Sequence, residues 1–169
     1  MTEELFDIYD EAGNRIGTAP RRECHGNPKL LHHTAHVVVF HPETGDILLQ
    51  KRSQDKDIQP GKWDTAVGGH LALGEDYEAG ARRELAEELG VTAPVQLEYL
   101  FDGRIRNDIE SEDVRVFGLR MAENFAFQAS EIDAIRFWRA DELFAPENRR
   151  EFTPNLCAEL DELRKRGLI

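Results

Sequence analysis

The sequence predicts a single domain of the α/β/α class, in which helices cover both faces of a central mixed β-sheet. Two observations predict this fold. Short apolar segments bounded by turn residues recur along the chain, as strands do, and two longer segments carry apolar residues at helical spacing. The chain has 169 residues, 40% of them hydrophobic, which suits one domain over residues 1–169 with a buried core.

The first half of the chain is expected to form two β-hairpins, because two pairs of apolar segments each flank a turn that contains glycine. Written as strand, turn and strand, the hairpins cover 5–9, 10–14 and 15–18 (about 4–19 in all), and then 34–41, 42–46 and 47–52. A polar loop at 53–60 follows. The chain then re-enters a short strand at Gly61-Lys62-Trp63, before Gly68-Gly69.

The second half combines helices with further strands. Asp76 to Leu89 is expected to form a helix with an apolar stripe of Ala81, Leu85 and Leu89, and Gly90 directly after it suits a left-handed C-cap. The other expected elements are strands at 95–102, 114–121 and 132–138, a short helix at 141–144 and a C-terminal helix at about 154–166.

The most specific feature is the stretch 69–91, which reads GHLALGEDYEAGARRELAEELGV. It follows the pattern G-x5-E-x7-R-E-L-x-E-E-x-G-V, with fixed positions Gly69, Glu75, Arg83, Glu84, Leu85, Glu87, Glu88, Gly90 and Val91. At about 100° per residue, Glu84, Glu87 and Glu88 fall on one face of a helix, beside the apolar stripe. Burying that stripe against a sheet leaves the three carboxylates at the edge of a cleft.

Carboxylates on one helix face repel each other, at a cost of roughly 0.2–0.5 kcal/mol for an i, i+4 pair. A hard divalent cation would turn that repulsion into binding, and Mg²⁺ uses one or two carboxylates together with waters and substrate phosphate oxygens. Arg83 lies four residues before Glu87 and can orient it. The alternative, a solvated acidic helix face, does not account for Gly69, Glu75 and Gly90 at their offsets.

The composition argues against several other classes of function. A formal net charge of −12 disfavours a nucleic-acid polymer as partner, since phosphate-backbone binding needs clustered lysine and arginine. A protein this acidic must use a metal to act on phosphates. The sequence has no apolar run of about 18 residues, no secretory leader and no lipidation motif, so we expect a cytoplasmic protein without a membrane segment. Cys24 and Cys157 are too few for a disulfide framework and are expected to be idle thiols.

The stretch 69–91 resembles the signature of the Nudix hydrolases, enzymes that cut a diphosphate linked to another moiety, and it matches that signature at every fixed position. The resemblance implies a Nudix fold with a loop-helix-loop box and a small-molecule diphosphate substrate. It also implies a Mg²⁺ (or Mn²⁺) site, oriented by Glu75 and formed by Glu84, Glu87, Glu88 and the carbonyl of Gly69. The metal would polarise phosphoryl oxygens and lower the pKa of the water that attacks phosphorus.

Most of the chain is similar to one branch of this family, the proteins related to isopentenyl-diphosphate isomerase. The similarity lies in residues 31–36, 50–63, Gly69-His70 and 152–154. In that isomerase a cysteine with a role in proton transfer precedes the Gly-His step, and the hydrolase signature is eroded. This chain has Gly68 at the cysteine position and an intact signature, which favours hydrolysis. An isomerase-like enzyme and a catalytically idle ligand-binding domain stay as alternatives, and the identity of the diphosphate is left open.

The resemblance to the isomerase also indicates a second metal site. The residues that match its metal ligands by spacing are His25, His32, His70, Glu110 and Glu112. Imidazoles with carboxylates suit Zn²⁺ or Mn²⁺. We expect His32 and His70 beside the active-site cleft, on the face of the sheet that the box helix covers. The alternative is that the histidines are structural, as we expect for His33, His36 and His41.

Phosphate binding needs cations near the box. Arg52, at a strand end, and Lys56, in the loop that follows, are the expected contacts, and both match diphosphate-contacting positions of the isomerase. Arg104 and Arg106 are weaker candidates, and the indole of Trp63 is expected to be buried rather than to contact the ligand. The sequence leaves two points open: whether the protein is a homodimer, and which of Glu84, Glu112 and Glu131 is the general base.

Overall fold

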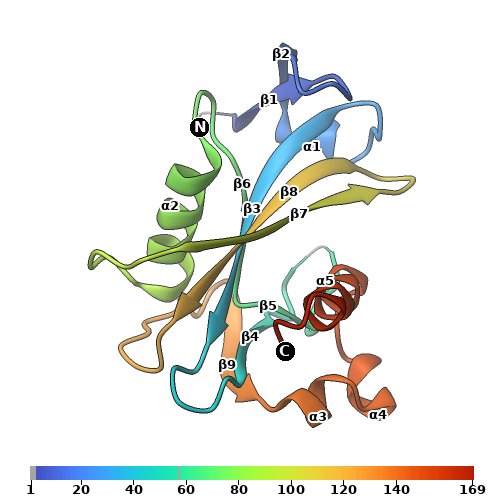
Figure 1. The fold of residues 1–169 in the computed structure, drawn as a ribbon. Coiled ribbons are helices and arrows are strands. Elements are labelled where there is room, and N and C mark those ends of the chain that lie inside the picture. Colours follow the sequence, from blue (N-terminus) through green and yellow to red (C-terminus); the bar gives the residue numbers. More distant parts are fainter. Residues whose placement is uncertain (1–2, 57) are drawn as a thin grey trace.

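The central strand of the sheet is β3 (Leu31–Phe40), which pairs with other strands along both of its edges (Figure 1). On one edge it lies parallel to β8 (Ser111–Arg120) along its whole length. On the other edge it lies antiparallel to β6 (Val67–His70) and, at its far end, to β4 (Ile47–Arg52). The sheet in the computed structural model is therefore mixed, as the sequence predicts.

The remaining strands extend the sheet on both sides. β1 (Leu5–Tyr9) and β2 (Arg15–Pro20) form the predicted N-terminal hairpin. β7 (Glu98–Arg106) pairs antiparallel with β8, while β9 (Ile132–Trp138) and β5 (Trp63–Thr65) flank β4. The structure describes residues 3–56 and 58–169, so residues 1–2 of the predicted domain and residue 57 of the predicted loop lie outside the described residues.

A fork in the sheet brings the glycines of the box to the box helix. β3 and β4 pair only through Val39–Leu48 and Phe40–Ile47, and then they diverge. Beyond that point β4 pairs with β5 instead, and β3 pairs with β6. The segment from Trp63 to His70 therefore crosses the opening between the two strands, and Gly68-Gly69 lie on the β3 side of it.

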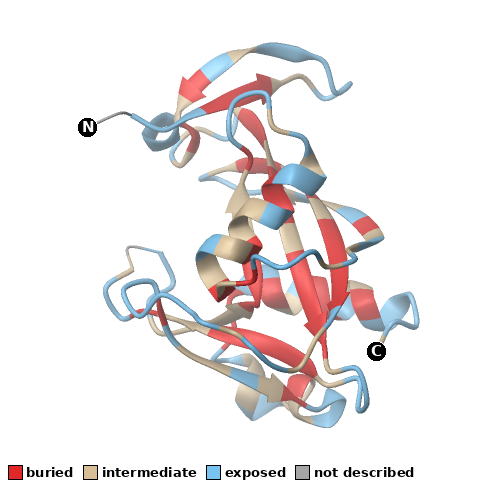
Figure 2. Cartoon of the chain, turned by 90° about the vertical axis from the view of Figure 1, so that its left-hand side faces the viewer, coloured by how far each residue is buried: buried red, intermediate tan, exposed pale blue. Residues whose placement is uncertain are grey.

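Helices cover the two faces of the sheet. Along β3, alternate residues point to opposite faces, as they do in any strand. One set packs in a core with α2 (Tyr77–Leu89), and the other set lies in a second core with α5 (Pro154–Lys165). Figure 1 shows the two helices on opposite sides of the sheet, and Figure 2 shows the buried residues that run along the strands between them. The α/β/α arrangement predicted from the sequence is confirmed.

Local sequence signals fix the ends of both main helices. Asp76 caps α2 by accepting a hydrogen bond from the backbone amide of Ala79, and Thr153 caps α5 by accepting one from Leu156. At the end of α2, Gly90 has φ 68°, and a Cβ there would lie 2.7 Å from the carbonyl oxygen of Ala126. The predicted bounds of both helices agree with the structure within one residue at each end.

Several elements differ from the prediction. Helices α1 (Arg21–Cys24) and α4 (Pro146–Arg149) were not predicted, because four residues are too few to show helical periodicity. α3 (Ala140–Leu143) lies one residue earlier than predicted. β7 and β8 continue to the pair Arg106–Ser111, beyond the apolar part of each strand. Charged side chains dominate this extension and form ion pairs across it, so its sequence lacks the apolar pattern of a strand.

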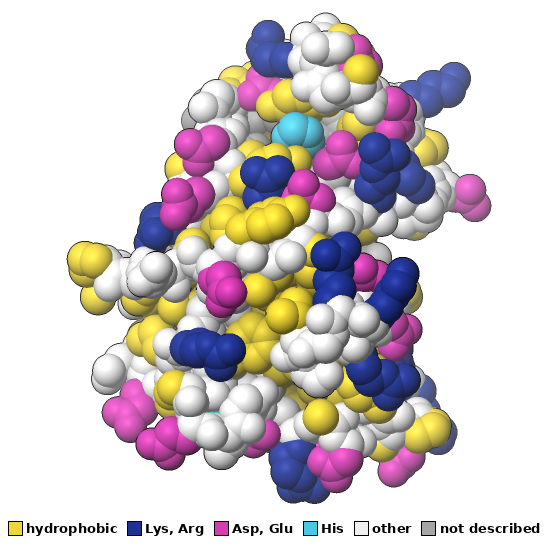
Figure 3. All heavy atoms as spheres, viewed as in Figure 1, with side chains coloured by type: hydrophobic (Ala, Val, Ile, Leu, Met, Phe, Trp, Pro, Cys, Tyr) yellow, Lys and Arg dark blue, Asp and Glu magenta, His cyan; other side chains and the backbone are white. Residues whose placement is uncertain are grey.

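The surface carries charges of both signs. On the face drawn in Figure 3, acidic and basic side chains are interspersed, and hydrophobic side chains gather near the middle of that face. None of the helices formed by the described residues combines the length and the apolar character that a membrane crossing requires.

Candidate active site

The glutamates of α2 contact the two glycines of β6. The Glu88 carboxylate accepts a hydrogen bond from the backbone amide of Gly68 at 3.0 Å. Glu84 lies against Gly69 so closely that a Cβ at that position would collide with its carboxyl group, so any larger residue there would displace the Glu84 side chain. The third carboxylate, Glu87, is more open, with 54% of its side chain exposed. The predicted acidic face therefore lies at the fork of the sheet.

Arg83 holds these carboxylates in place. Its guanidinium forms two hydrogen bonds with Glu75, at 2.9 and 3.0 Å, and it donates to Glu84 at 2.8 Å and to Glu87 at 3.2 Å. It also donates to the carbonyl oxygen of His70 at 2.9 Å, which ties α2 to the end of β6. Glu75 is thus bound in a bidentate pair, which suits a residue that orients its neighbours.

The charge state of the box favours a cation. Burial and, second to it, the negative charge of Glu84 raise the pKa of Glu88 to about 8. Burial also raises the pKa of Glu84. The ionised forms of these two half-buried carboxyl groups would be stabilised by a nearby divalent cation. The donor set, three carboxylates and a backbone carbonyl, consists of the oxygen ligands that Mg²⁺ and Mn²⁺ prefer.

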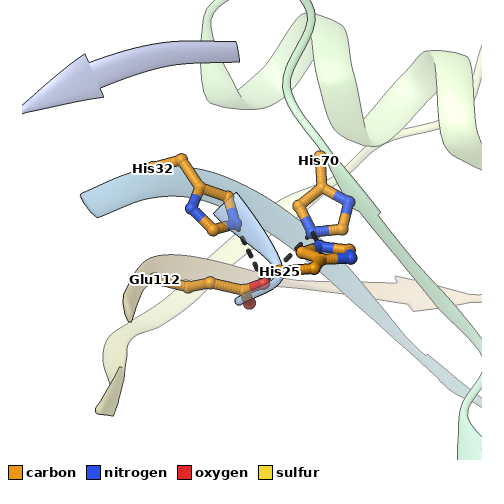
Figure 4. Close-up of side chains that lie close together, drawn as sticks. All are labelled: His25, His32, His70 and Glu112. Carbon is orange, nitrogen blue, oxygen red and sulfur yellow. Dashed lines mark hydrogen bonds and ion pairs between the residues drawn. The ribbon is translucent and has the colours of Figure 1, made fainter. Parts of the chain in front are cut away.

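A second cluster of possible ligands lies under the N-terminal hairpin. The Nε2 atoms of His25 and His70 are 3.0 Å apart, and one oxygen of Glu112 lies 3.1 Å from His70 Nε2 and 3.2 Å from His32 Nε2 (Figure 4). One ligand atom from each of these four residues lies within 4.8 Å of the other three. Glu110, the fifth predicted ligand, is farther out, 3.9 Å from His25 Nε2.

The expected position of these histidines is wrong in one respect. His32 and Thr34 alternate along β3 with Ala35, which packs with α2, and His70 lies opposite Thr34 in the register of β6. Both histidines therefore lie on the α5 face of the sheet, not on the α2 face. His32 is fully buried, whereas His70 still lines the same cleft as the box glutamates because β6 is an edge strand.

That cleft has a volume of about 620 Å³. It is lined by the three box glutamates, by His25, His70, Glu110 and Glu112, and by Arg52 and Lys56. Both predicted phosphate contacts thus face it, and each is paired with an acid: Arg52 lies 3.5 Å from Asp64, and Lys56 contacts Glu131.

Other candidates lie elsewhere. Trp63 packs edge-to-face against Trp138, with ring centroids 5.2 Å apart, and it does not line the cleft. Arg104 and Arg106 line a separate cavity under α5. His33 stacks between Tyr9 and Tyr77.

The remaining histidines and cysteines also lie apart from the cleft. His41 accepts a hydrogen bond from the amide of Glu43 in the turn after β3. Burial raises the pKa of the Cys24 thiol to about 11, and Cys157 is only half-buried.

Sequence reasoning missed part of the cleft wall. Asp64, on β5, accepts a hydrogen bond from the hydroxyl of Thr153 at 3.0 Å, and both residues line the cleft beside Arg52. Burial raises the pKa of Asp64. A single acidic residue in a three-residue strand offers no periodic pattern, and only its position directly after Trp63 pointed to this region.

Comparison with known proteins agrees with this geometry. The NUDIX domain family matches residues 30–157. The chain is 36% identical over 156 residues to an uncharacterized Nudix hydrolase of Yersinia pestis, covering 90% of this chain and 81% of that protein. It is 36% identical over 151 residues to Nudix hydrolase 3 of Arabidopsis thaliana, covering 81% of this chain but only 19% of the plant protein. An isopentenyl-diphosphate Delta-isomerase of Nocardia farcinica is 42% identical over 87 residues, which is 52% of this chain and 49% of the isomerase.

Solved structures share the fold. A Deinococcus radiodurans protein superposes with a TM-score of 0.81 at 22% identity, covering 94% of this chain and 98% of that one. The NUDIX domain of Shewanella oneidensis NrtR, solved with ADP ribose, superposes with a TM-score of 0.62 at 22% identity, covering 82% of this chain and 89% of the other.

Proposed function

The chain belongs to the Nudix hydrolases, and from this premise we propose that it hydrolyses the diphosphate linkage of a nucleoside diphosphate derivative or a related organic diphosphate, with a divalent metal and water attack at phosphorus. One observation carries the proposal. Glu84 and Glu88 are half-buried against Gly69 and Gly68, and they line a cleft that Arg52 and Lys56 also line. Carboxylates for a metal and cations for phosphate thus line one volume.

Each side chain has a proposed part in the reaction. Glu84, Glu87, Glu88 and the carbonyl of Gly69 would hold Mg²⁺ or Mn²⁺, which when bound polarises phosphoryl oxygens and lowers the pKa of a water. Arg83 fixes the orientation of Glu84 and Glu87, and Glu75 fixes Arg83.

The substrate phosphates are proposed to bind the two cleft cations. Arg52 offers a planar fork to phosphate oxygens, and Lys56 offers a point charge. Because both are paired with acids in the free protein, phosphate binding would exchange Asp64 and Glu131 for substrate oxygens.

The general base stays open among Glu84, Glu112 and Glu131. Each is already paired in the structure: Glu112 with two imidazoles, Glu131 with Lys56, and Glu84 with Arg83. All three line the cleft, so each is a candidate to accept the proton of the attacking water.

The second metal site also stays a proposal. Three imidazoles and the Glu112 carboxylate converge, and burial lowers the pKa of His25 to about 4, so that ring is neutral and able to ligate at neutral pH. This donor set fits Zn²⁺ or Mn²⁺. Elemental analysis of the purified, dialysed protein tests it. If the protein retained no metal, the result would contradict the second site.

Two alternative functions have less support. The similarity to an isomerase over 87 residues favours isomerase-like chemistry, but the cysteine position of that enzyme is Gly68 here, and a Cβ at Gly68 would lie only 3.1 Å from the ring of His36. A catalytically idle domain would not need the intact carboxylate set.

The proposed partner is a small molecule. The net charge of −12 and the interspersed charges of Figure 3 disfavour a nucleic-acid polymer. The expectation of a cytoplasmic protein stays a prediction, and whether the protein is a homodimer stays open.

The test is an assay of phosphate and pyrophosphate release over nucleoside diphosphates and triphosphates, nucleotide sugars, dinucleotide polyphosphates, and isoprenoid and thiamine diphosphates. We expect turnover with Mg²⁺ or Mn²⁺, loss of turnover with chelator and recovery when metal is returned. No release from any compound with either metal would overturn the proposal.

A further inference from the structure

Strand β7 forms an open margin of the sheet. It pairs with β8 along one edge, and among the described residues no strand pairs with its other edge (Figure 1). The amide of Asn107 donates to the carbonyl oxygen of Glu110 at 3.2 Å, so the backbone of residue 107 faces β8. Because successive residues of a strand alternate, the backbone amides and carbonyls of Asp102 and Arg104 point away from β8, toward the open edge.

The side chains at this edge are charged and exposed. Asp102 and Arg104 flank Gly103, with 52% of the Asp102 side chain and 65% of the Arg104 side chain exposed. On the α2 face of the sheet, Asp102 pairs with Arg115 at 2.8 Å, and Arg104 lies 3.8 Å from Asp113. Charged side chains on an edge strand usually oppose pairing with another strand. Here the order of the charges selects one pairing instead.

The edge is complementary to itself about Gly103. When β7 lies antiparallel to a second copy of β7 and a two-fold axis passes through Gly103, Asp102 of each copy lies opposite Arg104 of the other. The outward backbone groups of these two residues then meet, so each such pair exchanges two backbone hydrogen bonds. On the other face of the sheet, Phe101 of one copy lies opposite Ile105 of the other. Charged, backbone and apolar groups therefore all match in one register.

Neighbouring registers are unfavourable. An axis through Asp102 or through Arg104 places two aspartates or two arginines directly opposite each other, which destabilises a strand pair. An axis between two residues opposes an outward backbone group to one that faces β8, so the hydrogen bonds cannot form. The edge strand β2 has no comparable pattern, because its Gly17 is flanked by the uncharged residues Ile16 and Thr18.

We propose that β7 is an interaction surface for β7 of a second copy of this chain, paired antiparallel about Gly103, so that the sheet continues through a two-fold symmetric dimer. The occupant is a second copy because the charge order of this edge complements itself. The inference is independent of the proposed function. A contact made by one strand from each chain lies at the small end of protein interfaces, so we expect a dimer that dissociates on dilution.

Charge reversal tests the pairing. Sedimentation equilibrium of the full chain should give a mass that rises with concentration toward twice that of one chain. Asp102→Arg leaves only arginine at the paired positions, and Arg104→Asp leaves only aspartate, so either variant alone should dimerise at least tenfold more weakly. In an equimolar mixture of the two variants every aspartate again faces an arginine, and a heterodimer should form with the affinity of the wild-type dimer.

The matched control is another exposed pair with the same spacing, Arg139 and Asp141, which lie 3.0 Å apart at the start of α3. Arg139→Asp and Asp141→Arg should each keep wild-type dimerisation, and circular dichroism checks that all variants are folded. A wild-type chain that stays monomeric at every concentration would overturn the inference. Equal dimerisation of Asp102→Arg and wild type, or a mixture of the folded β7 variants that stays monomeric, would do the same.

Hydrogen exchange of the wild-type protein locates the interface without any substitution. Raising the concentration through the dimer transition should slow exchange of the Asp102 and Arg104 amides at least tenfold, because both gain hydrogen-bond partners. The amide of Thr18, which points outward from the edge strand β2, should exchange at an unchanged rate. A dimer in which the amides of Asp102 and Arg104 gain no protection would have its interface elsewhere and would contradict the inference.

Discussion

Two clusters of ionisable groups meet at β6, and they differ in how their charge is balanced. On the α2 side, burial raises the pKa of Glu84 and that of Glu88. The single positive charge of Arg83 therefore does not compensate the negative charges of this cluster. On the α5 side, Glu112 is also buried, but hydrogen bonds from His32 and His70 hold its pKa well below the usual range of a glutamate. The first cluster needs an external cation, whereas the second is already compensated within the protein.

This difference indicates which cluster depends more on metal. A site whose own groups satisfy each other can form without an ion, and an ion then adds stability. A site in which carboxylates outnumber the cations beside them gains its working charge state only when a metal ion is bound. We therefore expect loss of the box carboxylates to affect catalysis most, and loss of the histidine cluster to affect metal content and stability more than turnover.

The largest expected effect is on turnover in the box. Glu88→Gln and Glu87→Gln should each lower kcat by at least about 10²-fold, because the transition state loses charge stabilisation by the metal. In chelator at pH 7, Glu88→Gln should raise the free energy of unfolding, because the carboxyl group is ionised in the unfolded chain but held protonated in the folded protein by its raised pKa of about 8, and glutamine removes that cost.

The control for this change is Glu78→Gln on the same helix, where 58% of the Glu78 side chain is exposed and the residue lies outside the cleft lining. It should keep wild-type turnover. Near-wild-type kcat in both Glu87→Gln and Glu88→Gln would remove the basis for the metal site.

The second prediction compares two histidines whose pKa values move in opposite directions. Burial alone would lower the pKa of His36, but the Glu159 carboxylate, 2.7 Å from its Nδ1, more than offsets burial and raises that pKa to about 9. The contribution of His36 to stability is therefore complete below pH 6.5 and is lost as the pH rises through 9. The contribution is on the order of 3–4 kcal/mol, from about 1.4 kcal/mol per pKa unit. The pKa of His25 is lowered to about 4 in the folded protein. As the pH falls from 6.5 to 4, the unfolded chain binds a proton at His25 that the folded protein does not, so the free energy of unfolding decreases.

Urea unfolding in chelator between pH 4 and 10 measures both effects. Relative to wild type, Glu159→Gln should flatten the loss of stability between pH 6.5 and 9, and His25→Asn should flatten the loss below pH 6.5. If Glu159→Gln left the alkaline slope unchanged, the His36–Glu159 pair would not be the group that titrates.

The third prediction concerns metal added to the histidine cluster. Zn²⁺ should raise the melting temperature, because a ligand that binds only the folded state adds about 2.7 kcal/mol at a concentration of 100 times Kd. His25→Asn should remove most of this rise, since it deletes one of four converging ligands at the accessible edge, where 17% of the side chain is exposed.

The comparison is made with Glu88→Gln, which leaves the histidine cluster intact and should keep the rise. Equal metal-induced shifts in His25→Asn and wild type would show that the histidines do not bind the ion.

The same contrast explains how much the sequence could predict. The box is local: Glu84, Glu87 and Glu88 lie within five residues of one helix, so their spacing alone placed them on one face. His25 and His70 are 45 residues apart, and no periodic pattern links them. Their proximity depends on the register of β6 against β3, and the sequence indicated it only through resemblance to the isomerase.

The surroundings of His36 depend wholly on such register. His36 lies between Gly68 and Val116 because two different strands pair with β3 along opposite edges, one antiparallel and one parallel. Sequence analysis predicted β8 but not β6, and it predicted neither offset, so His36 was expected to be structural and Glu159 was not singled out. One residue of slip along β3 would have moved every one of these side chains to the other face.

The smallest expected effect is on isomerase activity, where we predict none. Isopentenyl diphosphate should not be converted to its dimethylallyl isomer by the wild-type protein, because Gly68 supplies no side chain to move a proton. Gly68→Cys should not confer efficient conversion either. A Cβ at this position would lie 3.1 Å from His36 Cδ2 and 3.2 Å from Nε2, so the His36 ring would have to shift to admit the new side chain. NMR detection of the methyl groups of the dimethylallyl product measures the outcome, with Gly17→Cys as the control for an added thiol. Product from the wild-type protein would show that this site isomerises isopentenyl diphosphate without a cysteine. The preference for hydrolysis over isomerisation would then be wrong.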